Sequence, residues 1–160
     1  MPIFETHFAV SKYFLALANE TGSYISNLKL QKLIFYYQAW YFSYTDKKLF
    51  NDDFQAWIHG PVIPESYHNY KKHGYNPIII DDLDKDYIIK FRAKFNEDER
   101  DFLSQVETFY MGKTGYELER LSHSESPWVD ARKGIPEDEP SEEVITLKSM
   151  KSYYAKYISD

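Results

Sequence analysis

The sequence predicts a mainly α-helical fold, a compact helical bundle with one or two short minor β-strands. Apolar residues recur at three-and-four spacing in several segments, which is the period of helices with one buried face. Capping residues, glycine or proline bound most of these segments. Only one short run, FQAWIHG, alternates in the manner of a strand. The 160 residues predict one domain, 1–160, with a core that needs no disulfide.

The two N-terminal segments predict core helices. Residues 3–22 carry aromatic and aliphatic side chains at helical spacing, and Gly22 is a plausible C-terminal stop. Residues 26–44 contain a broad apolar stripe that follows Ser26 or Asn27 as the capping residue. Aromatic residues also lie off this stripe, so we expect neighbours to cover the second helix on more than one side.

A rigid corner follows in residues 54–74. The alternation in FQAWIHG predicts a short strand or extended edge, which Gly60 and Pro61 interrupt. Pro64 suits the first turn of a helix, where its missing N–H costs nothing. We expect this helix to run to a stop at Gly74.

The middle of the chain gives a weaker pattern and then a clear helix. Residues 75–90 are short of apolar periodicity and rich in acid, so they predict a loop with at most a strand at 78–80. Asn96 with Glu99 three residues later resembles a capping pair. The helix that it opens carries regular apolar residues and ends at Gly112.

Three further helical segments complete the prediction. Thr114 and Glu117 form a capping box before the short helix GYELERL. Ser126 before Pro127 begins another short helical turn. The last helix is predicted over residues 144–158, whose apolar side chains share one side.

Composition limits the classes of function. A net charge of −6 disfavours a large nucleic-acid footprint, which needs clustered Lys and Arg. The absence of cysteine excludes disulfides, thiol catalysis and cysteine-bound zinc. No apolar run approaches the roughly 20 residues of a membrane span, and MPIFETHF lacks the features of a secretory leader, so we expect a cytoplasmic protein. The aromatic content of 18% suits either a core or an interface.

Catalytic and metal-binding patterns are weak. The five histidines form no HExxH motif. Glu65 and His68 stand three residues apart, but a di-metal carboxylate site needs a second such pair, so we interpret them as a solvated helix face. Ser122 and His123 adjoin in LSHSESPW, but adjacency is not the geometry of a triad. We expect no catalytic, cofactor or metal site, and no enzyme.

Four stretches occur in an order that is specific when they are taken together. They are LKLQKLIFYYQAW at 28–40, FNDDFQAWIHGPVIPESYHNYKKHG at 50–74, LERLSHSESPWVDAR at 118–132 and EEVITLKSMKSYYAKYI at 142–158. In these stretches the chain resembles the Panacea domain family, the SocA-like and GepA-like antitoxins found in bacterial genomes and prophages.

The resemblance implies a mostly helical antitoxin that binds and neutralises a toxin protein, commonly encoded by an adjacent gene. Toxins paired with this family are chemically diverse and include relatives of alarmone synthetases that stop translation. Some relatives resemble proteolytic adaptors, which deliver the toxin to an ATP-dependent protease. Others carry a DNA-binding extension, which we do not expect here.

The resemblance also marks scaffold or binding residues without making them catalytic. We hypothesise that Trp57, the Gly60–Pro61 corner and the LSHSESPW segment pack together, and that the corner holds Trp57 and His59 against the LQKL helix. The candidate residues are Leu30, Gln31, Lys32, Leu33, Trp57, His59, Gly60, Pro61, Val62, Pro64, His123 and Trp128.

Two further hypotheses stay open at this point. A prophage-encoded metal-dependent hydrolase would need Glu65, His68 and His123 to converge on a metal ion. For the antitoxin, the acidic runs DDLDKD and PEDEPSEE could cover a basic active-site entrance of the toxin through complementary charge.

Overall fold

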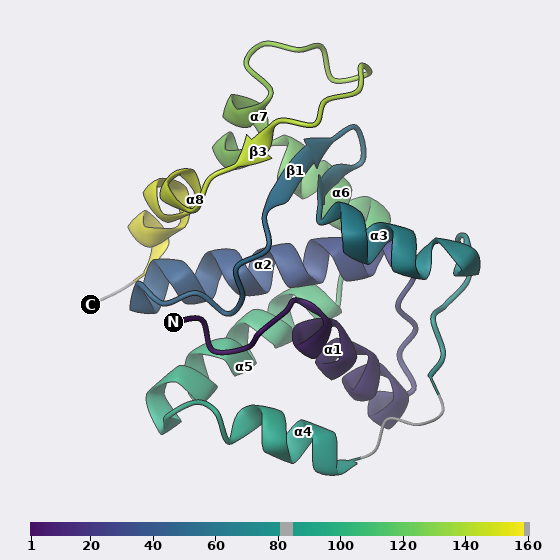
Figure 1. The fold of residues 1–160 in the computed structure, drawn as a ribbon, viewed down its shortest axis with the longest axis vertical. Helices are drawn as coiled ribbons and strands as arrows, with labels where there is room; N and C mark the ends of the chain where they lie inside the picture. The colour runs from purple at the N-terminus through teal and green to yellow at the C-terminus, as the bar shows by residue number, and fades with distance from the viewer. Residues whose placement is uncertain (81–84, 159–160) are drawn as a thin grey trace.

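A computed structural model describes residues 1–80 and 85–158 of the chain (Figure 1). Its elements follow one another as α1 (Phe8–Thr21), α2 (Asn27–Thr45), β1 (Phe54–Trp57), β2 (Gly60–Val62), α3 (Pro64–Tyr70), the 3₁₀ turn η1 (Lys71–His73), α4 (Lys85–Arg92), α5 (Glu97–Met111), α6 (Gly115–His123), α7 (Ser126–Ala131), β3 (Val144–Ile145), α8 (Leu147–Tyr154) and the 3₁₀ turn η2 (Ala155–Tyr157). The predicted fold class, mainly α with a minor sheet, is confirmed.

Helix α2 is the centre of the molecule. Figure 1 shows it crossing the middle, with α1, α4 and α5 on one side and the small sheet with α6, α7 and α8 on the other. It packs against α8, α5, α6, α1 and α3. Most of its side chains are buried, including the polar ones of Gln31, Lys32 and Gln38. The sequence pattern of apolar residues on both faces had indicated this burial.

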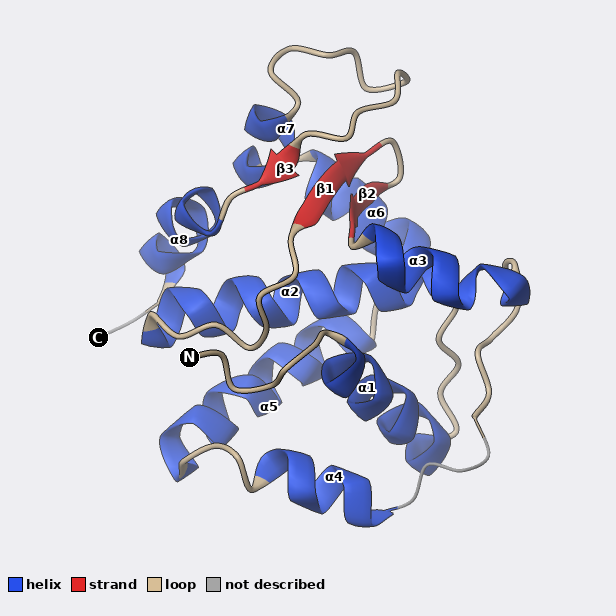
Figure 2. Ribbon diagram, in the orientation of Figure 1, coloured by secondary structure: helices blue, strands red, loops and turns tan. Residues whose placement is uncertain are grey.

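The sheet is small and antiparallel, with the strand order β2-β1-β3 (Figure 2). Strands β1 and β2 form a hairpin in which Trp57 pairs with Gly60 and Ala56 with Pro61. Gly60 and Pro61, predicted to interrupt the strand, therefore begin its partner. Gly60 has φ +104°, a conformation that glycine adopts without the strain of a Cβ atom.

The C-terminal helix is shorter than the prediction of 144–158. Val144 and Ile145 form β3 instead, because they pair with Phe54 and Gln55 of β1. The helix begins only after Thr146, whose side chain accepts a hydrogen bond from the backbone N–H of Ser149. Apolar residues in a short run suit a strand and a helix alike, so periodicity alone did not separate the two.

The predicted first helix was also too long, since residues 3–7 precede α1 and are not helical. Ile3 and Phe4 instead donate backbone hydrogen bonds to the carbonyls of Lys48 and Leu49. The N-terminal residues therefore run beside the segment that follows α2.

Residues 75–80 form a loop, and the suggested strand at 78–80 is absent from this part of the described chain. Helix α4 was missed, because only Ile88 and Phe91 of its eight residues are buried and its start is acidic. Phe91 stacks on Tyr13 of α1 at a centroid distance of 3.9 Å. The helix thus depends on a tertiary contact rather than on its own periodicity.

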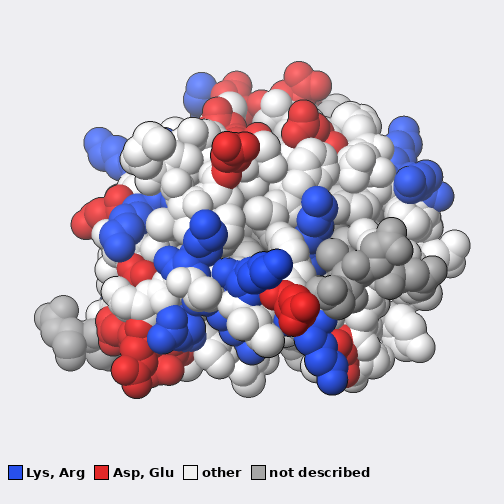
Figure 3. All heavy atoms as spheres, turned by 60° about the horizontal axis from the view of Figure 1, so that its bottom comes forward, with Lys and Arg blue, Asp and Glu red and all other residues white. Residues whose placement is uncertain are grey.

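The charges on the lower face of Figure 1 are mixed. Figure 3 turns this face forward and shows Lys and Arg side chains across its middle and at its sides, with an acidic group among the central ones and further acidic groups at the top and the lower left. Arg92 of α4 lies 3.8 Å from Glu107, and Lys85 lies 3.9 Å from Glu20. Neighbouring carboxylates therefore partly neutralise the basic side chains that α4 contributes.

The predicted capping pair of α5 is present and can be tested. The side chain of Asn96 accepts from the backbone N–H of Glu99 at 2.8 Å, and that of Glu99 accepts from the backbone N–H of Asn96. We expect Asn96→Ala to lower the free energy of unfolding by about 1 kcal/mol, since one helix N–H loses its acceptor. Urea denaturation measures this, with the exposed Asn76→Ala as the control; equal stability of the two variants would contradict the capping role.

Candidate functional site

Lys32 of α2 forms the centre of the hairpin corner. Its side chain is fully buried, and its Nζ donates a hydrogen bond to the carbonyl oxygen of Pro61 at 3.1 Å. Gly60 leaves the space that this side chain needs, because a Cβ atom there would lie 2.5 Å from Lys32 Cε and 2.9 Å from Ser122 Oγ. The LQKL helix and the GPV strand therefore fit together through a lysine and a glycine.

Burial changes the acid–base chemistry of Lys32. Removal of the amine from water lowers its pKa to about 7, and the nearby carboxylate of Glu119 opposes this only in part. A depressed lysine pKa is common at catalytic sites, but it also follows from burial alone. Because the side chain is enclosed, the arrangement fits a scaffold role and gives a substrate no access.

Gln31, next to Lys32, joins α2 to the start of α3. Its Nε2 donates to Ser66 Oγ at 2.9 Å and to Asn27 Oδ1 at 3.1 Å, and its Oε1 accepts from the backbone N–H of Ile63. Every polar atom of this buried amide is used, which is the condition for burying it at low cost. Pro64 then opens α3 at its first turn, as predicted.

The other strand of the hairpin, β1, is held by the end of the LSHSESPW segment and by Arg132, which follows it. The indole of Trp128 donates to the carbonyl oxygen of Trp57 at 2.8 Å. Arg132 donates to the carbonyl oxygen of Ala56 at 2.7 Å, and its guanidinium lies 4.6 Å from the centroid of the Trp128 ring. The Trp57 ring itself is half-buried and meets Tyr67 of α3 edge-on.

The two histidines of the motifs lie apart. The side chain of His59 is 70% exposed, and its Nδ1 lies 2.9 Å from Glu119 Oε1. It therefore extends towards α6 and solvent, whereas we expected the corner to hold it against the LQKL helix. His123 stacks on Trp128 at 4.0 Å, with its Nδ1 3.1 Å from Glu137 Oε1. The remaining motif residues Leu30, Leu33 and Val62 are buried.

The convergence that a hydrolase would require is not seen among the described residues. Glu65 contacts His7, and His123 contacts Glu137, while His68 faces the ring of Trp57. Ser122 donates its hydroxyl to the carbonyl oxygen of Glu119. The motif residues therefore form a packed corner rather than a reactive cluster.

Two hollows open next to this scaffold. The first, the hairpin groove, has a volume of about 760 Å³ and lies between the N-terminus of α2, the β1–β2 hairpin, the start of α6 and the loop before β3. Trp57, His59 and Val62 line it together with the exposed Tyr75 and Tyr116. The end of the acidic run PEDEPSEE also reaches this groove, whereas residues 81–84 of the run DDLDKD lie outside the described chain.

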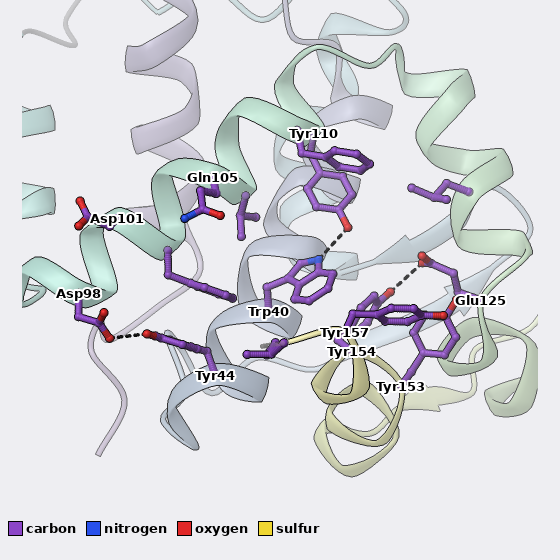
Figure 4. A pocket seen from close by; sticks show the side chains of 15 residues that line it. Trp40, Tyr44, Asp98, Asp101, Gln105, Tyr110, Glu125, Tyr153, Tyr154 and Tyr157 are labelled. Carbon is purple, nitrogen blue, oxygen red and sulfur yellow. Dashed lines mark hydrogen bonds between the residues drawn. The ribbon is translucent and has the colours of Figure 1, made fainter. Parts of the chain in front are cut away.

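The second hollow, the aromatic groove, has a volume of about 710 Å³ (Figure 4). Figure 4 shows rings from α2, α5, α8 and η2 along its walls, with Tyr44 pointing to Asp98 and Trp40 to Tyr110. Its lining consists of Trp40, Tyr44, Asp98, Asp101, Phe102, Gln105, Val106, Phe109, Tyr110, Leu121, Glu125, Tyr153, Tyr154, Tyr157 and Ile158.

A buried carboxylate lies at the inner end of the aromatic groove. Tyr36 and Tyr154 each donate a hydroxyl hydrogen bond of 2.7 Å to Oε1 of Glu125. Burial raises the pKa of Glu125, and the two hydroxyl donors act in the opposite direction by stabilising the carboxylate. The inner end of the groove is therefore polar although its walls are aromatic.

The charges of the lining have one sign. Asp98, Asp101 and Glu125 carry carboxylates, and none of the fifteen lining residues is Lys or Arg. Lys113 and Lys156 lie beside the groove, with their ammonium groups 4.6 Å and 4.5 Å from the ring centroids of Phe109 and Tyr153. The aromatic groove thus combines carboxylates with rings that already contact cations.

Sequence reasoning did not find the aromatic groove. Trp40 and Tyr44 stood in the predicted apolar stripe of the second helix, and Phe102 and Phe109 in that of the α5 segment. Their spacing predicts a shared helix face but not which part of that face stays open. The exposed fractions of Phe109 (57%) and Tyr157 (60%) supply that missing information.

A family model described as antitoxin SocA-like, Panacea domain, matches residues 30–129. The chain belongs to this family. No curated protein and no solved structure matches it. The Panacea match begins at the LQKL motif and ends just after Trp128, so it contains Lys32 and the β1–β2 hairpin, whereas Arg132 lies beyond it. It also contains the α5 wall of the aromatic groove, while the α8 wall lies beyond it.

The described part of this Panacea chain contains no helix that is both long enough and apolar enough to cross a membrane.

Two glycines test the fit at the corner. Gly60 and Gly22 both have positive φ, but only Gly60 has neighbours within 4 Å of an added Cβ atom. We expect Gly60→Ala to lower the free energy of unfolding by at least about 2 kcal/mol more than Gly22→Ala does. It adds overpacking to a backbone strain that is at least as large at φ +104° as at the left-handed φ +68° of Gly22. Thermal and urea unfolding compare the two; equal losses would show that the corner accommodates the methyl group.

Burial of Lys32 makes the free energy of unfolding depend on pH. The unfolded chain keeps this amine protonated to about pH 10, whereas the folded chain releases the proton near pH 7, so stability rises with pH between these values. The slope contributed by Lys32 approaches about 1.4 kcal/mol per pH unit. We expect Lys32→Met to lose this contribution when urea denaturation is measured from pH 7 to pH 9. The partly buried Lys29, whose pKa is also lowered, stays in both proteins and serves as the internal control. If the free energy of unfolding changed with pH in the same way in both proteins, the lowered pKa of Lys32 would be contradicted.

Proposed function

We propose that this protein is an antitoxin that neutralises a cognate toxin by direct binding and without catalysis. The observation that carries the proposal is the match to the SocA-like antitoxin family over residues 30–129, joined to an open aromatic groove on the matched scaffold. The polar residues of the hairpin corner that the motifs marked are held by internal hydrogen bonds, which suits support of a binding surface.

We place the toxin contact in the aromatic groove and assign its occupant as a basic segment of the toxin. Three carboxylates among the lining residues favour Lys or Arg, and the absence of Lys and Arg from that lining avoids repulsion inside it. Tyrosine and tryptophan are common anchors of protein interfaces because they bury large areas at low entropic cost.

The rings at the rim favour the same occupant. Phe109 and Tyr157 are mostly exposed, which leaves apolar surface for a partner to cover. Lys156 already lies over Tyr153 and Tyr157, at 4.5 Å and 5.4 Å from their ring centroids. A lysine or arginine of the toxin would make the same kind of cation–π contact with the free faces of these rings.

The function is tested by expressing the adjacent open reading frame under tight control, with and without this protein, in bacteria that contain or lack their ATP-dependent cytosolic proteases. We expect growth to recover in both hosts, since binding alone neutralises the toxin. Recovery only where the protease is present would identify the alternative, a proteolytic adaptor. An adjacent product that is harmless, or lethal in every strain, would contradict the assignment to that gene pair.

Charge reversal tests the contact surface. Asp101 in the aromatic groove and Glu142 in the hairpin groove are both exposed carboxylates, so their lysine variants are a matched pair. We expect Asp101→Lys to weaken toxin binding at least about tenfold, because it repels a basic segment, and Glu142→Lys to leave binding nearly unchanged. Calorimetry with the purified toxin measures both; loss of binding confined to Glu142→Lys would move the contact to the hairpin groove.

A further inference from the structure

Three side chains from separate parts of the chain meet near the start of α1. His7 directly precedes α1, Asp52 belongs to the segment before β1, and Glu65 lies in the first turn of α3. One ligand atom from each of them, an imidazole nitrogen and two carboxylate oxygens, lies within 4.8 Å of the other two. The fold thus brings together three groups that the sequence separates by up to 58 positions.

Contacts already hold this cluster in place. His7 Nε2 lies 2.9 Å from Glu65 Oε1, and the backbone N–H of His7 donates to Asp52 Oδ2 at 3.0 Å. The imidazole is enclosed, with Phe8 at a centroid distance of 4.1 Å and Phe50 at 6.4 Å. Its position is therefore fixed before any ligand arrives.

The imidazole of His7 is only partly satisfied by the protein. Its side chain is fully buried, and its Nδ1 has no hydrogen-bond partner among the described residues. A buried polar nitrogen without a partner costs free energy, and such atoms are few in folded proteins. The nitrogen that faces the carboxylates is Nε2, so this atom is the candidate ligand, and the unpartnered Nδ1 lies on the other side of the ring.

We propose that His7, Asp52 and Glu65 bind a divalent transition-metal ion, with zinc as the best fit. One imidazole nitrogen with two carboxylate oxygens is a donor set that suits zinc, manganese or ferrous iron, whereas magnesium and calcium prefer oxygen ligands alone. Burial increases from Glu65 through Asp52 to His7, so the ion enters from the solvent side and a water completes its coordination.

Zinc binding would require only small movements of the three ligand side chains. Zinc lies about 2.0–2.2 Å from nitrogen and oxygen ligands, which places tetrahedral neighbours roughly 3.4 Å apart. The pair formed by His7 and Glu65 is already closer than this, and no ligand pair exceeds 4.8 Å. Because the Glu65 side chain is 69% exposed, it can rotate towards the ion without disturbing the core.

The site is separate from the proposed toxin contact, since none of its three residues lines the aromatic groove. A bound ion would join the N-terminus, the segment after α2 and helix α3, which contact one another here through the backbone N–H of His7, which donates to Asp52, and through the His7–Glu65 side-chain contact. The ion would therefore stabilise the scaffold.

Calorimetric titration of tag-free protein with zinc chloride tests the site. We expect one zinc ion per chain, with binding at least about tenfold weaker in both Asp52→Asn and Glu65→Gln, since each variant removes a charged ligand. His68→Gln, on the same helix but outside the cluster, is the control and should bind as the unmodified protein does. The three variants leave the buried His7 in place, so each is expected to fold.

Two results would overturn the metal site. One is the absence of zinc binding by the unmodified protein, which would leave an ordinary His–Glu pair. The other is equal binding by all variants, which would place the ion elsewhere. Cobalt(II) provides an independent check, because a tetrahedral site gives visible absorption bands that Asp52→Asn should abolish and His68→Gln should retain.

Discussion

The burial of most of α2 is the constraint on which the rest of the structure depends. A buried helix cannot leave its buried polar side chains without partners, since each unpaired group would cost free energy. Gln38 shows the solution, because its amide donates to the carbonyl oxygen of Phe50 and accepts from the backbone N–H of Leu49. The segment after α2 is thereby fixed along the helix that precedes it.

The same constraint explains two glutamates, the buried Glu125 and the largely buried Glu107, that accept hydrogen bonds from α2. Tyr36 donates to Glu125, and its neighbour Tyr37 donates to Glu107. A second tyrosine completes each pair, Tyr154 at Glu125 and Tyr13 at Glu107. Burial raises the pKa of both glutamates, and the hydroxyl donors limit that rise. The high tyrosine content thus serves the core as well as the surface, which composition alone could not separate.

The sequence predicted most helices because their ends and faces are local properties. Both capping boxes and the proline that opens α3 were readable from spacing alone. Features that depend on distant partners could not be predicted from local spacing. Strand β3 exists because β1 pairs with it, and α4 forms where Phe91 stacks on Tyr13. The motifs indicated the hairpin corner, but the burial of Lys32 beneath Gly60 needed the fold, and so did the open aromatic groove.

We propose that a rigid α2 scaffold presents the aromatic groove to the toxin. Hydrogen exchange of the backbone amides, measured with and without the bound toxin, tests this most directly. We expect slow exchange throughout α2 in both states and new protection of residues 98–109 and 153–158 in the complex. Protection gained instead around residues 57–75, with the groove segments unchanged, would contradict it.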